Sequence, residues 1–242
     1  TDVGYYNAAV KIKALLVAVV TSLGTVLLPR ASYYIENGFI SEFKKISSKA
    51  LNFIFIISLP MIVYFIVFAK ECIFFLSGTK FVPSTIPMQI IMPTLLFIGL
   101  TNILGIQILI PLGKERYVLY STIIGALVDL ILNAILIPQF QSAGAAIGTL
   151  VAEFAVFIVQ FILIDSDIRE MFKTFQVYKI VIAVIAGLLC SCWVKNTSLH
   201  VFFTLAISAI IFFPVYGIVL LLLKEQFITE VKNNLLAKFK TH

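Results

Sequence analysis

Two carboxylates, Asp129 and Glu153, lie in stretches that otherwise consist largely of Leu, Ile, Val, Ala and Phe. A charged side chain in hydrocarbon is costly, so ionisable residues in such stretches are candidates for transport or proton transfer. Each lies twelve residues from Gln141, where the turn between the two stretches is centred. With a rise of about 1.5 Å per residue, both would lie roughly 18 Å from that turn, near the middle of a bilayer.

An antiparallel pair of helices would bring the two carboxylates to one depth. Like-charge repulsion and desolvation would then favour a shared proton, which is the chemistry that a proton-coupled transporter needs. In the alternative, each carboxyl is protonated or paired with Asn133, Thr149 or a neighbouring helix, and only fastens the bundle. Further polar residues lie on the same two helical faces: Thr122 and Asn133 beside Asp129, and Thr149 and Gln160 beside Glu153.

The first apolar stretch carries a charge of the opposite sign, Lys11, about two turns below its outer end. Its helical face also carries Asn7, Ala18, Ser22 and Thr25. In a watery cavity Lys11 would attract an anionic group such as a diphosphate; alternatively it snorkels outward or pairs with Asp129 or Glu153. Lys13 lies about 200° further round the helix, so we expect it to snorkel or to pack against another helix.

A third stretch, LTNILGIQILIP, contains Asn102, Gly105 and Gln107. Amide and small residues suit close helix packing and an irregular inner wall. We therefore take Asn102, like Asn7, Lys11 and Asn133, as a candidate for substrate binding, and Asp129 and Glu153 as candidates for ion coupling. Pro60, Pro93 and Pro214 predict kinks in their spans.

The composition places these stretches in a membrane. The 242 residues are 61% hydrophobic and 12% charged, with a mean hydropathy of +1.07, whereas soluble domains average roughly 45–50% apolar and about 25% charged. The apolar runs are continuous rather than alternating, which indicates helices rather than barrel strands. We expect an all-α, polytopic transmembrane bundle with seven spans, at roughly 5–30, 44–68, 86–110, 117–137, 142–164, 178–195 and 200–223.

The spans divide into three regions. Residues 1–164 would form a transport lobe from the first five spans, and residues 165–223 would add two helices. Residues 224–242 would form an amphipathic tail on the membrane surface, with apolar residues four apart at Phe227, Val231, Leu235 and Phe239. The chain begins with Thr1 almost directly before a span and shows no signal peptide, so we expect a piece of a longer protein.

The basic residues of the loops predict the orientation, because Lys and Arg accumulate on the cytoplasmic side. Thirteen fall on the side that holds the tail and three on the other, with Lys11 and Lys13 inside a span. The start of the chain would thus lie outside and the tail in the cytoplasm. This asymmetry, together with attraction to anionic lipids, accounts for the net charge of +6 without a nucleic-acid partner.

The sequence disfavours an enzyme. It contains no HExxH, GxSxG, paired CxxC or P-loop motif, and its two histidines stand apart near loop ends. No loop is long enough to fold as a catalytic domain. We therefore expect no catalytic residues, no cofactor and no metal site.

Several motifs occur in a familiar order: VGYYNAAVKI, TSLGTVLLPRAS, ECIFFLSGTKF, IMPTLLFIGLTNILGIQILIPLGKE and LILNAILIPQFQSAGAAIGTLVAEF. Over residues 3–157 this order resembles bacterial polysaccharide flippases, the Wzx-like branch of the multidrug/oligosaccharidyl-lipid/polysaccharide (MOP) superfamily, which is MATE-like in fold. Residues 158–242 match it only in hydropathy.

The resemblance implies about fourteen helices in two lobes, of which this chain would supply helices eight to fourteen and a missing N-terminal lobe the rest. Such proteins reside in the bacterial plasma membrane and move an undecaprenyl-diphosphate-linked oligosaccharide to the outer leaflet by alternating access, for capsule, exopolysaccharide or O-antigen synthesis. Lys11 matches the basic position after YYNAA, and Asn133 and Glu153 match positions of the last motif. Asp129 stands where the family more often has Asn.

Two other functions remain open from the residues. In a MATE-like multidrug or cation exporter, Asp129 and Glu153 would attract a cationic drug and exchange it for protons or sodium. The chain could also be a structural membrane subunit, and alone it is expected to transport nothing, because alternating access needs two lobes. The expected partners are the lipid-linked oligosaccharide, membrane lipids and the missing lobe.

Overall fold

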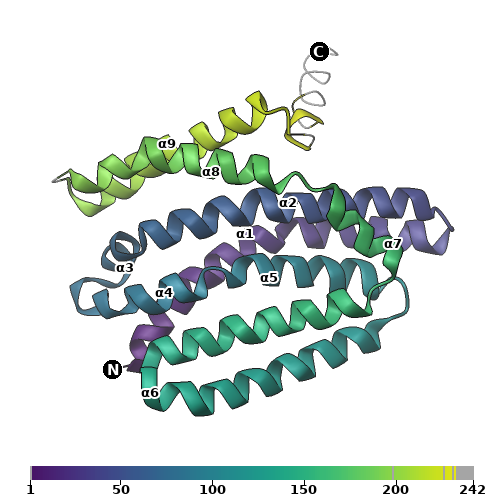
Figure 1. Ribbon diagram of the computed structural model, residues 1–242, viewed down its shortest axis with the longest axis horizontal. Coiled ribbons are helices and arrows are strands. Elements are labelled where there is room, and N and C mark those ends of the chain that lie inside the picture. The colour runs from purple at the N-terminus through teal and green to yellow at the C-terminus, as the bar shows by residue number, and fades with distance from the viewer. Residues whose placement is uncertain (1, 198, 226, 231, 233–242) are drawn as a thin grey trace. The chain divides into compact units, whose positions relative to one another are not determined.

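The structure is a computed structural model that describes residues 2–197, 199–225, 227–230 and 232 (Figure 1). Within these ranges the chain is helical and forms no strand. It divides into two compact units, Thr1–Thr174 and Phe175–His242. Most of the predicted amphipathic tail, including Val231, Leu235 and Phe239, lies outside the described residues.

The first unit is built from four long segments and several short helices. Its α-helices are α1 (Asp2–Glu36), α2 (Ile40–Val67), α3 (Ala69–Ser77), α4 (Thr85–Ile91), α5 (Thr94–Thr101), α6 (Glu115–Leu163) and α7 (Ser166–Arg169). The 3-10 helices η1 (Thr79–Ser84) and η3 (Glu170–Thr174) and the π-helix η2 (Asn102–Leu109) complete it. The packed core includes Ile54, Leu95 and Ile103, each fully buried.

Helix α6 is two helices joined by a sharp reversal. Its 49 residues would extend about 74 Å if straight, more than twice the roughly 30 Å of a bilayer core. At Gln141 the backbone is non-helical, with φ 52° and ψ −125°, and Figure 1 shows the two halves running antiparallel. We call residues 115–140 the first arm and residues 142–163 the second arm. The predicted turn at Gln141 is thereby confirmed.

Glycines let the two arms approach closely. A Cβ added at Gly125 would overlap the side chain of Val156, and one added at Gly148 would overlap that of Asn133. Small residues suit helix contacts in a membrane, where packing rather than water exclusion drives association.

The third predicted span is broken rather than continuous. It consists of residues 79–91 and 94–109, bent by 47° at a break that contains Pro93, the proline predicted to kink it. Pro60 and Pro214 lie within α2 and α9, which remain continuous helices.

The second unit is a helical hairpin of α8 (Val177–Ser191) and α9 (Val201–Leu222), with the 3-10 helix η4 (Cys192–Asn196) after α8. The side chain of His200 caps α9 by accepting a hydrogen bond from the amide of Phe202. Together the described residues contain five helices long and apolar enough to cross a membrane, and the bent pair makes a sixth. These counts take α6 once; its two arms match the predicted spans 117–137 and 142–164. A polytopic helical bundle is confirmed.

Candidate functional site

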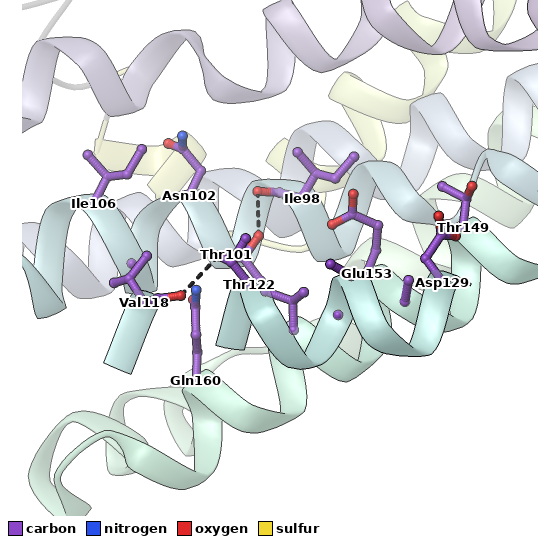
Figure 2. A pocket seen from close by; sticks show the side chains of 15 residues that line it. Ile98, Thr101, Asn102, Ile106, Val118, Thr122, Asp129, Thr149, Glu153 and Gln160 are labelled. Carbon is purple, nitrogen blue, oxygen red and sulfur yellow. Dashed lines mark hydrogen bonds between the residues drawn. The ribbon is translucent and has the colours of Figure 1, made fainter. Parts of the chain in front are cut away.

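A cavity of about 460 Å³ lies between α5, η2 and the two arms of α6. We call it the central cavity, and Figure 2 shows its lining. Its walls alternate apolar residues with polar ones, and the polar ones are Thr101, Asn102, Thr122, Asp129, Thr149, Glu153 and Gln160. A cavity with this lining within an apolar bundle is where polar or ionic chemistry can take place.

Both predicted ion-coupling carboxylates line this cavity, Asp129 from the first arm of α6 and Glu153 from the second. Figure 2 shows their side chains beside each other, with Thr149 next to Asp129. Each is partly exposed in this chain, and the negative charge of Asp129 acts on Glu153. The expectation that an antiparallel pair of helices brings the two carboxylates to one depth agrees with the reversal at Gln141 and with their place in one cavity.

A second cavity of about 460 Å³ lies next to the Gln141 reversal and also includes the start of α1. We call it the turn cavity. Asp129 and Thr149 line both cavities, so they form the wall between them. On the turn-cavity side, the hydroxyls of Tyr6 and Thr149 form a hydrogen bond of 2.8 Å, which ties α1 to the second arm of α6.

Two side-chain oxygens at the turn cavity are buried without a hydrogen-bond partner, Asp129 Oδ1 and Asn133 Oδ1. They lie four residues apart and so one helical turn apart on the same face. A buried acceptor without a donor is costly, by roughly 1–3 kcal/mol. Oxygen atoms left open in this way suit a proton or a hard cation.

The predicted polar face of α1 is present, but it points away from these cavities. Asn7, Lys11, Ala18 and Ser22 are all exposed, and neither cavity is lined by them. The side chain of Thr25 lies outside the description. Lys11 therefore does not pair with the two carboxylates, and that alternative is wrong.

The charge of a different α1 lysine, Lys13, acts on the two carboxylates, although Lys13 is not among the residues that line either cavity. It is half-buried, and its charge interacts with Glu153 and with Asp129. Its half-buried position beside α6 agrees with the expectation that Lys13 packs against another helix, but that expectation did not include its interaction with the two carboxylates. Its spacing of seven residues from Tyr6 places the two on one face of α1, but only the contact of Tyr6 with Thr149 shows that this face packs against α6.

The end of the central cavity away from Gln141 is lined by amides. Asn102 lies at the start of the π-helix η2, and Gly24 leaves room for it on α1, because a Cβ there would overlap the Asn102 side chain. Gln160 is 2% exposed, donates from Nε2 to Ser121 Oγ over 3.1 Å and leaves its Oε1 without a partner. π-Helical turns often occur at functional sites.

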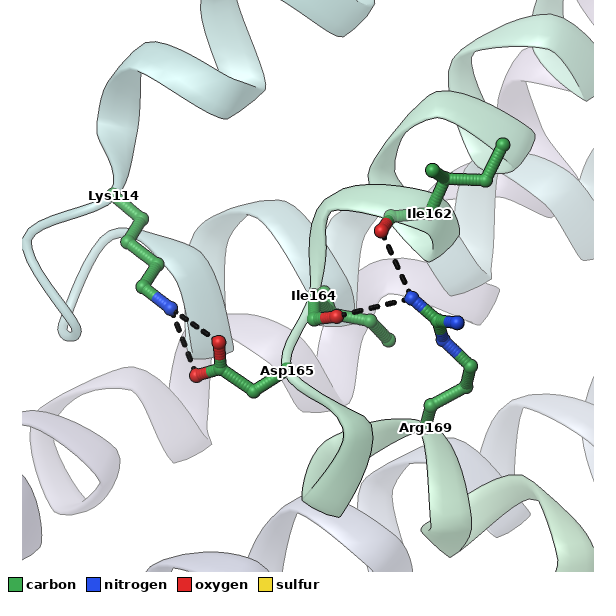
Figure 3. A network of polar contacts seen from close by, with 5 residues as sticks. All are labelled: Lys114, Ile162, Ile164, Asp165 and Arg169. Carbon is green, nitrogen blue, oxygen red and sulfur yellow. Dashed lines mark hydrogen bonds and ion pairs between the residues drawn. The ribbon is translucent and has the colours of Figure 1, made fainter.

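Ionic contacts fasten the end of the unit opposite Gln141, and Figure 3 shows part of them. Lys114 Nζ donates to both oxygens of Asp165, at 2.7 and 2.8 Å. Arg169 donates to the carbonyls of Ile162 and Ile164 at 2.9 and 3.3 Å.

A second pair lies at the same end, where Lys44 Nζ donates to Asp167 over 2.6 Å. This hydrogen bond and the ammonium charge hold the pKa of Asp167 below its usual value. These contacts join the start of α2, the loop before α6 and the segment after it, and so hold both ends of the α6 hairpin.

Comparisons with known proteins agree with this architecture. The family described as "Lipid II flippase MurJ" matches residues 2–213. An uncharacterized membrane protein of Methanocaldococcus jannaschii, MJ1068, is 27% identical over 233 residues, which are 95% of this chain and 45% of that protein. A solved structure titled "Lipid II flippase MurJ, inward closed conformation" superposes with a TM-score of 0.74 at 18% identity, covering 90% of this chain and 46% of the other. The chain thus spans less than half the length of both.

Proposed function

The chain belongs to the lipid II flippase MurJ family, a family of transporters rather than enzymes, and from this we propose that it is one half of a flippase for a lipid-linked precursor. The family match over residues 2–213 carries the proposal. Because the chain spans 46% of the solved flippase, we further propose that an N-terminal lobe of the same protein supplies the other half. The two lobes would rock against each other in alternating access.

The exposed polar face of α1 is the proposed substrate surface. A Lys at the centre of a span costs about 2.5–3.5 kcal/mol when it faces lipid, and Lys11, about two turns inside its span, is exposed together with Asn7 and Ser22. This face is therefore better explained by a water-filled passage between two lobes than by lipid. Lys11 would attract the diphosphate of the carrier lipid, and Asn7 would donate to it from the neighbouring turn.

The substrate is proposed as a saccharide linked to undecaprenyl diphosphate. Lipid II, the cargo named for the family, and the oligosaccharides of surface-polymer synthesis share this anionic head and apolar tail. The head would cross in the passage while the tail stays in lipid. Asn102 and Asn133, which we expected to bind substrate, line the two cavities inside this lobe and fit the wall of the ion site better.

Ion coupling is proposed for Asp129 and Glu153. Two carboxylates that share a cavity, and buried oxygens that lack donors, favour uptake of a proton or a cation. Loading this site would bias the lobe toward one of its two orientations.

The proposed location is the bacterial plasma membrane. The excess of Lys and Arg on one set of loops supports a start outside and a tail in the cytoplasm. On this orientation the turn cavity would lie toward the outer face, and the ion pairs of Asp165 and Asp167 toward the cytoplasmic face.

One observation favours a second function, a MATE-like multidrug or cation exporter. The described residues that line the central cavity include two acidic ones and no basic one, which would suit a cationic cargo exchanged for protons or sodium. The exposed Lys11 opposes this reading, because it would repel a cation in the passage.

The test uses deletion of the gene in its own host and complementation with its complete product. A membrane-impermeant, sugar-modifying probe reports which leaflet holds each lipid-linked saccharide. We expect the precursor to accumulate in the cytoplasmic leaflet after deletion. The wild-type gene should restore the normal distribution between the leaflets, and so should Lys45→Ala, which alters an exposed Lys of α2. Lys11→Ala should not restore it. Separate probes for lipid II and for other saccharides identify the cargo. Normal leaflet distribution with new sensitivity to cationic drugs would instead establish the exporter.

A further inference from the structure

Lys13 has no role in the substrate surface, yet it is placed next to the ion site. It lies on the side of α1 that also carries the buried Ala9, Ile12 and Leu16, and it is half-buried itself. Lys11, two residues earlier, is exposed. A Lys directed into the protein within a span needs a negative partner, because an isolated buried charge is costly.

The hydrogen bond between Tyr6 and Thr149 sets the register that supplies those partners. From Tyr6, Lys13 follows seven residues later on nearly the same face of α1; from Thr149, Glu153 follows four residues later on the second arm. Both helices run away from the Gln141 end (Figure 1). Lys13 is therefore about 10 Å and Glu153 about 6 Å below the bond, a difference that the long stem of Lys spans.

The three charges form one electrostatic unit. The ammonium of Lys13 attracts Glu153 and Asp129, and the two carboxylates repel each other. With all three ionised, Lys13 offsets one of the two carboxylate charges; Asp2, which lines the turn cavity with Asp129, is a further acid near this unit. Lys13 leaves at least one carboxylate oxygen available for a cation or a proton, since Asp129 Oδ1 is buried without a hydrogen-bond partner.

An independent feature of the cavity indicates a ligand there. Gln160, only 2% exposed, lines the same cavity as the carboxylates, and its Oε1 has no hydrogen-bond partner. A neutral oxygen of this kind stabilises a positive charge without adding to the charge count.

We propose that Lys13 is a tethered counter-cation that offsets one negative charge of the Asp129–Glu153 site, so that the lobe takes up a monovalent positive charge, a proton or an alkali ion, rather than a divalent cation. The proposal rests on the ion-coupling role of these carboxylates. It assigns to Lys13 the charge balance of the site, and hence its selection against divalent cations.

The test measures binding rather than transport, on the complete gene product purified in detergent. Thermal denaturation in NaCl or KCl is compared with choline chloride at equal ionic strength, and with MgCl2 and CaCl2. The infrared carbonyl band of protonated carboxyl groups reports the proton. Stabilisation by NaCl or KCl identifies an alkali ion as the positive charge that binds. A carboxyl band that Glu153→Gln or Asp129→Asn removes identifies a proton.

Charge rescue is the decisive comparison. Glu153→Gln removes one negative charge from the site, and we expect alkali-ion affinity to fall at least about tenfold, or the carboxyl band to vanish. Lys13→Met together with Glu153→Gln restores one negative charge and should recover binding to within about threefold of wild type. Lys13→Met alone should gain stabilisation by Mg²⁺ or Ca²⁺, or about double the carboxyl band.

Two controls separate charge from structure. Lys13→Arg keeps the positive charge and should bind cations like wild type. Lys11→Met removes a Lys from the exposed face of α1 and should leave cation affinity unchanged, whatever its effect on flipping. A double variant no better than Glu153→Gln, or a Lys13→Met variant identical to wild type, would refute the role of Lys13 while leaving ion coupling intact. Wild type that binds no alkali ion and shows no carboxyl band would refute both.

Discussion

The contact between Gly125 and Val156 sets the separation of the two arms of α6 next to the carboxylates. Gly125 lies one turn before Asp129, and Val156 lies three residues after Glu153. Gly125 is buried, and a Cβ there would overlap Cγ2 of Val156 and lie 3.4 Å from the carbonyl oxygen of Ala152. The change Gly125→Ala must therefore push the arms apart or displace Val156.

The expected cost can be worked out against a matched control. Overpacking costs about 1–3 kcal/mol, whereas Gly→Ala within a helix gains up to about 1 kcal/mol, so Gly125→Ala should lower the free energy of unfolding by up to about 2 kcal/mol. Gly217 lies in α9 with open space around it. Gly217→Ala keeps only the propensity gain and should be neutral or stabilising by up to about 1 kcal/mol.

Urea titration of the complete gene product in one detergent, followed by circular dichroism, compares the variants. Adding Val156→Ala removes the overlapping methyl groups, so the double variant should be more stable than the sum of the single effects predicts, by at least about 1 kcal/mol. If Gly125→Ala were as stable as Gly217→Ala, or if Val156→Ala gave no rescue, the close approach of the arms would be wrong.

Three further substitutions test other contacts. Tyr6→Phe should cost about 0.5–1.5 kcal/mol of unfolding free energy by removing the bond to Thr149. In a Thr149→Val background, where this bond is already absent, Tyr6→Phe should cost nothing further. An undiminished cost there would exclude this bond as the cause. Gln160→Leu should leave stability nearly unchanged in the same titration, because it removes an unpartnered oxygen along with one hydrogen bond; a loss above about 3 kcal/mol would contradict that. Asp167→Asn should lower the denaturation midpoint slightly at neutral pH and low salt, since the depressed pKa of Asp167 means that its ion pair stabilises the fold above the unfolded-state pKa. The difference from wild type should vanish as the pH falls through the folded-state pKa. A difference that persists at pH 2 would show another cause.

The hairpin of α6 could be predicted because its signals are local. Two apolar runs of spanning length flank a polar turn at Gln141, and equal spacing from it then fixes the depth of Asp129 and Glu153. The exposed polar face of α1, which we propose as the substrate surface, could also be predicted, since residues four and seven apart share a side of a helix.

The sequence could not predict which of the two lysines of α1 lies on the side that packs against α6. Lys11 and Lys13 are both in the first span, and periodicity gives the angle between them but not the side that packs against α6. That choice depends on the contact between Tyr6 and Thr149, which lie 143 residues apart. The π-helix η2 was missed for a related reason, because the shift in its backbone hydrogen bonds leaves no mark in hydropathy.

The two faces of α1 explain how one helix could link the ion and the substrate. On our proposals, Lys13 belongs to the ion site and Lys11 to the substrate passage, and only two residues separate them. A helix moves as a unit, so any shift of α1 that follows charge neutralisation beside Glu153 must also move Lys11. The energy available for this shift is the difference in ion affinity between the two orientations of the lobe. Coupling would therefore be lost in a variant that keeps both lysines but breaks the register between α1 and the second arm, and the bond from Tyr6 to Thr149 is the described contact that fixes this register.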